Sequence, residues 1–138
     1  MSEYLFACGT LRPGLGPPEA AGLIRRWRYV GPAQVRGHLY DLGEYPGAIL
    51  DASSEAKVSG DVFELPDDQS PFAALDAYEG YDSANPEGSL FRRTKSLATL
   101  ADGREFECWV YVYNRVPTGA PLIESGDYAE WQSRKINH

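Results

Sequence analysis

The segment REFECWVYVYN, residues 104–114, has bulky side chains at most positions and constrains the fold more than any other part of the sequence. Asp102-Gly103 just before it is a strong signal for a tight turn, so residues 91–100 and 104–114 are predicted to form a β-hairpin. Successive side chains of a strand point to opposite faces. One face would hold Phe106, Cys108, Val110 and Val112, and the other Trp109, Tyr111 and Tyr113. Because both faces are bulky, this strand is predicted to be central in a sheet or part of a barrel.

Turn residues divide the rest of the chain into short segments, since 14 glycines and 10 prolines are spread over 138 residues. Further strands are predicted at residues 3–8, 33–42, 48–51 and 58–65. Helices are predicted at residues 17–27, 70–80 and 126–135, the second with Ser70 as N-cap, Pro71 as first residue and Gly80 as its end. Gly60 inside a strand indicates a bulge or a close backbone approach. The pattern favours one domain over residues 1–138, folded as a compact, partly closed β-barrel.

Charge and cysteine content limit the expected partners. The formal net charge of −7 at pH 7 argues against nucleic acid or an anionic membrane as the main partner. The basic cluster Arg25, Arg26 and Arg28 is interpreted as the solvent-facing side of a helix. Two cysteines, Cys8 and Cys108, are too few for a disulfide framework and are interpreted as free thiols in a reducing compartment. Because no stretch suits a membrane span or a signal peptide, we expect a soluble cytoplasmic protein.

The stretch FACGTLRPG, residues 6–14, ends an apolar strand in small residues. It lacks the Gly-Lys-Ser/Thr of a nucleotide-binding P-loop and the dinucleotide fingerprint. Gly9 and the short hydroxyl of Thr10 leave backbone N–H groups without side-chain cover, and such a turn can bind a carboxylate or an oxyanion. The alternative is an ordinary connection from a strand to a helix.

The second predicted helix places a glutamate on its buried side. At about 100° per residue, Phe72, Leu75 and Glu79 fall on one stripe, and Asp76 lies on its flank. Burial and the helix C-terminus both disfavour the charged carboxylate, so the pKa of Glu79 is expected to be raised. These properties make Glu79 a candidate general base. The alternative is a glutamate that pairs with Arg92 or Arg93, or that extends into water.

Other kinds of catalytic site find less support in the sequence. The chain has only two histidines, His38 and His138, so no metal site is expected. Cys8 as a nucleophile would leave His38 as its only histidine base, and no nucleophile elbow of the G-x-S-x-G kind occurs. One carboxylate and one anion-binding turn suit a reaction that needs proton transfer and positioning without a cofactor.

Seven segments occur in an order that is typical of a known family. They are FACGTLRPG, VRGHLYDLGEYPGAIL, VSGDVFEL, LDAYEGY, the hairpin strands FRRTKSL and CWVYVYN, and ESGDYAEW. Together they resemble the gamma-glutamylcyclotransferase-like superfamily, and most of all its short single-domain form, akin to gamma-glutamylaminecyclotransferases. The resemblance implies an α+β fold, a small mixed β-barrel flanked by short helices.

The resemblance also implies an activity. A small gamma-glutamyl amine or amide would cyclise by attack of its own α-amine on its γ-carbonyl, which releases 5-oxoproline and a free amine in a cofactor-independent acyl transfer. Glu79 takes the place of the family's catalytic glutamate, and Cys8, Gly9, Thr10 and Leu11 take the place of its substrate-binding loop. The family usually has tyrosine where this chain has Cys8.

Several further residues are candidates for contacts with the substrate. Tyr40, Tyr45, Pro46 and Gly47 are expected to line the pocket, Tyr113 to donate a hydrogen bond, and Arg12 to attract a carboxylate. Two other functions stay open at this point. The Cys8 departure is compatible with a non-catalytic small-molecule binding domain that retains the fold. A thiol-dependent enzyme that uses Cys8 is the third hypothesis.

Overall fold

The computed structural model describes residues 3–9, 27–65 and 71–136. Its strands are β1 (Tyr4–Ala7), β2 (Arg28–Asp41), β3 (Pro46–Leu50), β4 (Lys57–Glu64), β5 (Phe91–Leu100), β6 (Glu105–Tyr113) and β7 (Leu122–Ile123). Its helices are α2 (Pro71–Glu79), the short 3₁₀ helix η1 (Pro86–Gly88) and α3 (Tyr128–Ile136). The predicted helix at residues 17–27 lies outside the described residues except for Trp27.

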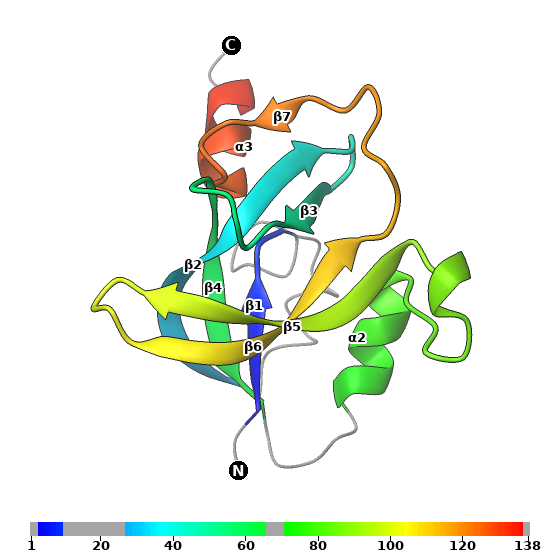
Figure 1. Cartoon of the computed structure of the whole chain (residues 1–138), viewed down its shortest axis with the longest axis horizontal. Helices are drawn as coiled ribbons and strands as arrows, with labels where there is room; N and C mark the ends of the chain where they lie inside the picture. Colours follow the sequence, from blue (N-terminus) through cyan, green and yellow to red (C-terminus); the bar gives the residue numbers. More distant parts are fainter. Residues whose placement is uncertain (1–2, 10–26, 66–70, 137–138) are drawn as a thin grey trace.

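Five strands close into a barrel in the order β2, β4, β1, β6 and β5, because β5 pairs again with β2 (Figure 1). The β1–β6 pair is parallel and the other four pairs are antiparallel, so the barrel is mixed. The helices α2 and α3 flank it on different sides. The predicted α+β fold, a small mixed β-barrel with short helices, is confirmed.

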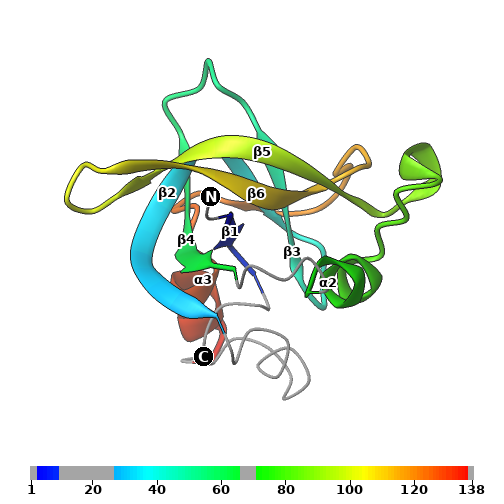
Figure 2. The ribbon, with the colours of Figure 1, turned by 90° about the horizontal axis from the view of Figure 1, so that it is seen from below.

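The long strand β2 belongs to two parts of the sheet. Its first half pairs with β4, and its second half pairs with β3 and with β7. Figure 2 shows how β2 curves around one side of the barrel. The sequence pattern predicts that this strand spans residues 33–42. The start is five residues earlier, since the ladder to β4 continues past a register irregularity between Tyr29 and Gly31.

The predicted alternation of β6 is confirmed, and its two faces belong to two different hydrophobic clusters. Cys108 and Val110 are fully buried inside the barrel, among Phe6, Val35, Leu39 and Val62. Tyr111 and Trp109 point the other way and pack with Phe72 and Leu75 of α2. The second face of β6 therefore holds α2 against the barrel.

The end of α2 is fixed by its backbone. Gly80 has φ of +71°, which glycine adopts at little cost. The Tyr81 N–H bonds to the Asp76 carbonyl at 2.8 Å, and the Gly80 N–H bonds to the Ala77 carbonyl at 3.3 Å. This is the Schellman pattern. The predicted start at Pro71 and stop at Gly80 are confirmed, whereas the Ser70 cap lies outside the described residues.

Gly60 of β4 lets β1 approach closely. A β-carbon added at Gly60 would lie 2.3 Å from the carbonyl oxygen of Ala7, so only glycine fits there. The close approach expected at this position is confirmed, and it sets where the end of β1 lies.

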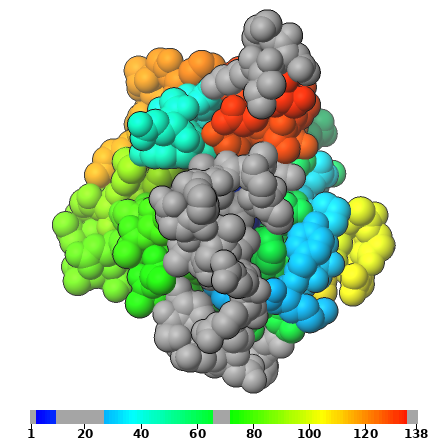
Figure 3. Space-filling view, turned by 180° about the vertical axis from the view of Figure 1, so that it is seen from behind, coloured from blue at the N-terminus to red at the C-terminus, as the bar shows by residue number. Residues whose placement is uncertain are grey.

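The helix α3 packs against the second half of β2, as Figure 3 shows from behind. The Trp131 indole N–H donates to Asp41 Oδ2 at 2.8 Å. Asp127 caps the helix, since its Oδ1 accepts from the Ala129 N–H at 2.9 Å. Neither α2 nor α3, nor any other described helix, is long and apolar enough to cross a membrane.

Candidate active site

A cavity of about 300 Å³ opens between the end of β1, the start of β3 and the C-terminal end of α2. The β1 side contributes residues 6–9, and the β3 side contributes Tyr45, Pro46 and Ala48. Residues 77–80 of α2 and its stop, together with Leu90, Phe91 and Tyr111, complete the described lining. A cavity of this size suits a small molecule.

Glu79 is the only charged residue among the described residues that line the cavity. It is partly buried. Burial raises the pKa of its carboxyl from 4.5 to about 7. The C-terminal end of a helix is also an unfavourable place for an anion. The direction of this pKa change agrees with the expectation from the helical pattern.

Cys8 and Gly9 lie across the same cavity, directly after β1. A β-carbon added at Gly9 would lie 2.8 Å from Cγ of Pro46, so the backbone of Gly9 packs tightly against this proline. The structure thus brings five of the predicted site residues to one cavity: Cys8, Gly9, Tyr45, Pro46 and Glu79. Thr10, Leu11 and Arg12 lie outside the described residues.

Aromatic rings form one wall of the cavity. The ring of Tyr45 meets that of Phe91 edge to face at 5.7 Å, and Phe91 in turn lies 5.6 Å from Tyr113. Gly47 packs closely against Tyr113, because a β-carbon at Gly47 would lie 3.0 Å from Cβ of Tyr113. Tyr40 pairs with Gly47 across β2 and β3. Tyr40, Gly47 and Tyr113 are not among the described lining residues, and their contacts with a substrate stay predictions.

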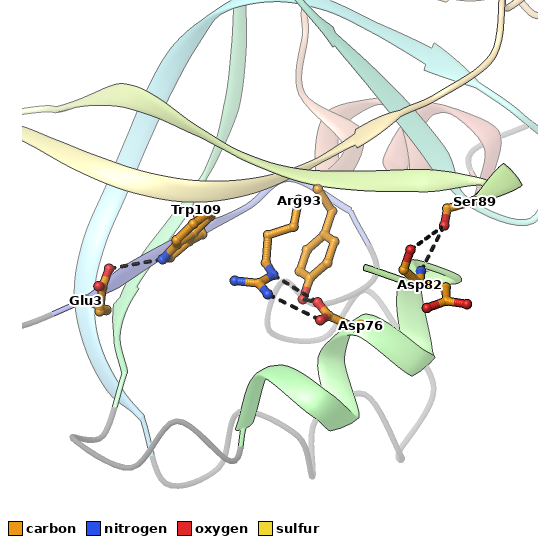
Figure 4. Close-up of polar contacts among 7 residues, drawn as sticks. Glu3, Asp76, Asp82, Ser89, Arg93 and Trp109 are labelled. Atoms are coloured by element: carbon orange, nitrogen blue, oxygen red, sulfur yellow. Dashed lines mark hydrogen bonds and ion pairs between the residues drawn. The ribbon is translucent and has the colours of Figure 1, made fainter. Parts of the chain in front are cut away.

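A partly buried ion pair joins Arg93 to Asp76 (Figure 4), and Asp76 lies one helical turn before Glu79 in the sequence. Arg93 Nε donates to Asp76 Oδ1 at 3.0 Å, and its second nitrogen donates to Oδ2 at 3.3 Å. The Tyr111 hydroxyl donates to Asp76 Oδ1 at 2.6 Å. Burial, and then this hydrogen bond, raise the pKa of Tyr111, so its hydroxyl keeps its proton. Of the two arginines considered as partners of Glu79, Arg93 pairs with Asp76 instead.

The described cysteines and the described histidine are not arranged as a thiol-dependent catalytic site would require. Neither Cys8 nor Cys108 forms a disulfide. Burial raises the pKa of the Cys108 thiol to about 12, so it is unreactive at neutral pH. His38 lies on β2 opposite Ile49, and it is not among the described residues around Cys8 in the cavity. Within residues 3–9, 27–65 and 71–136, no group of three potential ligands is arranged to hold a metal ion.

The sequence matches the family described as "Gamma-glutamyl cyclotransferase, AIG2-like" over residues 5–130. The chain belongs to this family. It is 35% identical over 92 residues to the gamma-glutamylcyclotransferase family protein YtfP of Escherichia coli, an alignment that covers 67% of each chain. The resemblance noted in the seven sequence segments is therefore confirmed at the level of the family.

Solved structures share the fold of this family member. The crystal structure of YkqA from Bacillus subtilis superposes with a TM-score of 0.75 at 21% identity and covers 100% of this chain, which spans 44% of that protein. The AIG2-like protein from Mus musculus superposes with a TM-score of 0.69 at 21% identity, over 91% of this chain and 88% of that one. At these identities the likeness concerns the fold.

Sequence reasoning missed part of this cavity. Tyr111 was assigned only to a face of β6, although that face is the one covered by α2. The helical pattern places Asp76 on the flank of the stripe, and the sequence suggests Arg93 as a partner of Glu79 and not of Asp76. The alternation of β5 and the position of Asp76 one turn before Glu79 were the available signals. Neither of these signals gives the distance between α2 and β5.

Proposed function

We propose that this protein is a gamma-glutamyl cyclotransferase that releases 5-oxoproline from a small gamma-glutamyl amine or amide. The observation that carries the proposal is the shared cavity. Glu79, with a pKa raised to about 7 by burial, faces the same small volume as Cys8 and Gly9. Family membership supports the general activity. The substrate, the product and the role of each residue are inferred from the site.

The reaction begins with a proton transfer. The α-ammonium group of the substrate gives a proton to the Glu79 carboxylate, and the resulting amine attacks the γ-carbonyl carbon. A five-membered ring closes and the carbonyl oxygen takes up negative charge. When the carbon–nitrogen bond of the amide breaks, Glu79 returns its proton to the leaving nitrogen. The ring nitrogen gives its second proton to solvent and the released amine takes one from solvent. Overall the α-nitrogen loses two protons and the leaving amine gains two, so no net proton is consumed.

The protein has little chemistry to supply beyond these transfers, because the nucleophile is part of the substrate. Holding the folded conformer in place can contribute up to about 7–11 kcal/mol. A positioned general base contributes roughly 10²–10⁴-fold. A base works best when its pKa lies near the working pH, and the value of about 7 for Glu79 meets this condition.

The backbone after β1 is the proposed binding element for the substrate's negative charge. The N–H groups from Gly9 to Leu11 would hold the substrate carboxylate or the developing oxyanion, and Arg12 would attract the carboxylate. The tight contact of Gly9 with Pro46 supports this proposal, because it leaves no room for a side chain at that point. An oxyanion donor of this kind is typically worth about 2.7–4 kcal/mol.

A binding domain without catalysis is the second candidate. It is favoured by one observation, the presence of Cys8 in the cavity at a position where the family usually has tyrosine. Such a domain would bind gamma-glutamyl compounds in the same cavity and release nothing.

Purified protein incubated with a panel of gamma-glutamyl amines, amides and dipeptides tests both candidates. We expect 5-oxoproline from the wild type and a loss of at least about 100-fold in Glu79→Gln. Glu55→Gln, which removes an exposed carboxylate, is the control and should retain full activity. Saturable binding by calorimetry with no release from any substrate would favour the binding domain. Undiminished release by a folded Glu79→Gln variant would refute Glu79 as the base.

A further inference from the structure

The carboxyl groups of Asp76 and Glu79 lie on neighbouring turns of α2. Residues three apart on a helix have β-carbons about 5–6 Å from each other. Asp76 is bound to Arg93 of β5 and to Tyr111 of β6, and its side chain is only 16% exposed. A partly buried charge so close to Glu79 acts on it more strongly than a solvent-exposed charge would.

Arg93 is held in place from several sides. Its guanidinium lies 4.2 Å from the centre of the Phe72 ring and 4.7 Å from that of Trp109, and its side chain is 18% exposed. The planar fork makes two hydrogen bonds to the Asp76 carboxylate. Figure 4 shows Arg93 reaching from β5 toward Asp76 on α2. Stacking on two rings and bidentate pairing restrict the guanidinium to this position.

Tyr111 connects this pair to the cavity. Its side chain lines the cavity that contains Glu79, and its hydroxyl donates to Asp76. The charge of Glu79 is also among the causes that raise the pKa of Tyr111, so the two groups interact electrostatically. Asp76, Arg93 and Tyr111 thus tie the last turn of α2 to two strands of the barrel.

We propose that Asp76, Arg93 and Tyr111 are positioning residues for Glu79. Their contacts fix the last turn of α2 so that Glu79 faces the end of β1, and the charge of Arg93 offsets the charge that Asp76 would otherwise exert on Glu79. The part of this inference that concerns catalysis rests on the proposed function. The part that concerns charge stands on the folded protein alone.

The charges around Glu79 determine in which direction its pKa should change in each variant. Among the described residues, titratable or charged groups come from each element around the cavity: Asp76 and Tyr78 on α2, Arg93 on β5, Tyr111 on β6, Cys8 after β1, and Tyr45 before β3. Of these, Asp76 and Arg93 form an ion pair, so they are the anion and the cation that act on Glu79. Removing the cation should therefore raise the pKa of Glu79 further, and removing the anion should lower it.

Titration of Glu79 by carboxyl-detected NMR tests the charge effect directly, with its resonance assigned by its loss in Glu79→Gln. In Arg93→Gln the midpoint should move up, and in Asp76→Asn it should move down, each by on the order of half to one pH unit. Arg92→Gln is the matched control, because it removes the same charge from the next, exposed position of β5. Its midpoint should equal that of the wild type.

The outcomes decide the inference whether or not the protein is active. Opposite movements in the two variants with an unchanged control support it, and unmoved or parallel midpoints overturn it. If Arg93→Gln does not fold, Arg93→Lys, which keeps the charge, replaces it. The expected result is then a wild-type midpoint in Arg93→Lys and a lower one in Asp76→Asn, and any other pair of results overturns the inference.

The positioning of Glu79 is tested separately by the kinetics of the active enzyme. Arg93→Lys keeps the charge but loses the bidentate fork. We expect kcat to fall roughly tenfold to a hundredfold with little change in KM and an unmoved pH profile. A merely structural role would lower the unfolding midpoint and leave kcat of the folded protein at the wild-type value. If the wild type releases no 5-oxoproline from any substrate, the proposed function fails, and the titration still decides the charge effect.

Discussion

Glu79 is the last residue of α2, and Gly80 follows it with φ of +71°. This pair ends the helix at the cavity, because the next two N–H groups turn back to the carbonyls of Ala77 and Asp76. Glu79 therefore projects from the end of α2, and the conformation of Gly80 determines where this helix ends.

Gly80→Ala should lower both stability and activity. Alanine in the left-handed region costs about 1–2 kcal/mol, and relief of that strain would turn the last residue of α2. Gly119→Ala is the matched control, because Gly119 has φ of +80° with open space around it. Urea unfolding should show a similar loss in both variants, whereas only Gly80→Ala should lose 5-oxoproline release. Equal activity in the two variants would contradict a special role for this helix end.

The raised pKa of Glu79 predicts a cost in stability at high pH. The pKa is about 7 in the folded protein against an ordinary 4.5, so the folded state holds the proton more tightly than the unfolded chain. The resulting stabilisation is complete below about pH 4.5 and is lost as the pH rises through 7. Glu79→Gln, which cannot ionise, should therefore be more stable than the wild type at pH 8, by about 3 kcal/mol or less. Urea unfolding of both proteins at pH 5 and pH 8 measures this, and a variant that is less stable than wild type at pH 8 would contradict it.

The two thiols should behave differently. Cys108 is fully buried with a pKa raised to about 12, so a thiol reagent at pH 8 should leave it unmodified while the protein is folded. Mass spectrometry after brief labelling, with Cys8→Ala as the control protein, counts the modified sites.

We also expect Cys8→Ala to retain turnover, because the proposed reaction uses the substrate's own amine as nucleophile. An inactive but folded Cys8→Ala variant would support the thiol-dependent alternative.

The packing of α3 should contribute measurably to stability. Trp131→Phe keeps most of the apolar contact but removes the donor to Asp41, whose other oxygen accepts from the Gly43 N–H at 2.8 Å. Loss of a hydrogen bond to a charged group typically costs about 1.5–3 kcal/mol. Thermal unfolding should show this decrease, and Gln132→Ala on the same helix offers a comparison away from Asp41. An unchanged midpoint in Trp131→Phe would mean that this contact does not hold α3 in place.

Local patterns were sufficient for much of the fold. The Asp102-Gly103 turn, the alternation of β6 and the Pro71-to-Gly80 span of α2 depend on residues close in sequence, and the structure confirms all three. The closure of the barrel depends instead on β5 pairing with β2, which are far apart in the chain. The short strand β7 has two residues, too few to produce a recognisable pattern.

The sequence predicts the carboxylate of the candidate site, Glu79, but not the contacts that surround it. The spacing of Phe72, Leu75 and Glu79 placed the carboxylate on the buried side of the helix from sequence alone. The bond between Asp76 and Tyr111 joins residues 35 positions apart, so it follows only from the packing of α2 on β6. The same holds for the contact of Gly9 with Pro46, which depends on how β1 and β3 meet at one end of the barrel.

The pH dependence of 5-oxoproline release, measured as kcat/KM for the wild type and Glu79→Gln, tests the central claim most directly. The wild type should rise along an ascending limb with a midpoint near pH 7, and Glu79→Gln should lose that limb together with at least about 100-fold in rate. A folded Glu79→Gln variant that keeps the wild-type profile and rate would contradict the account.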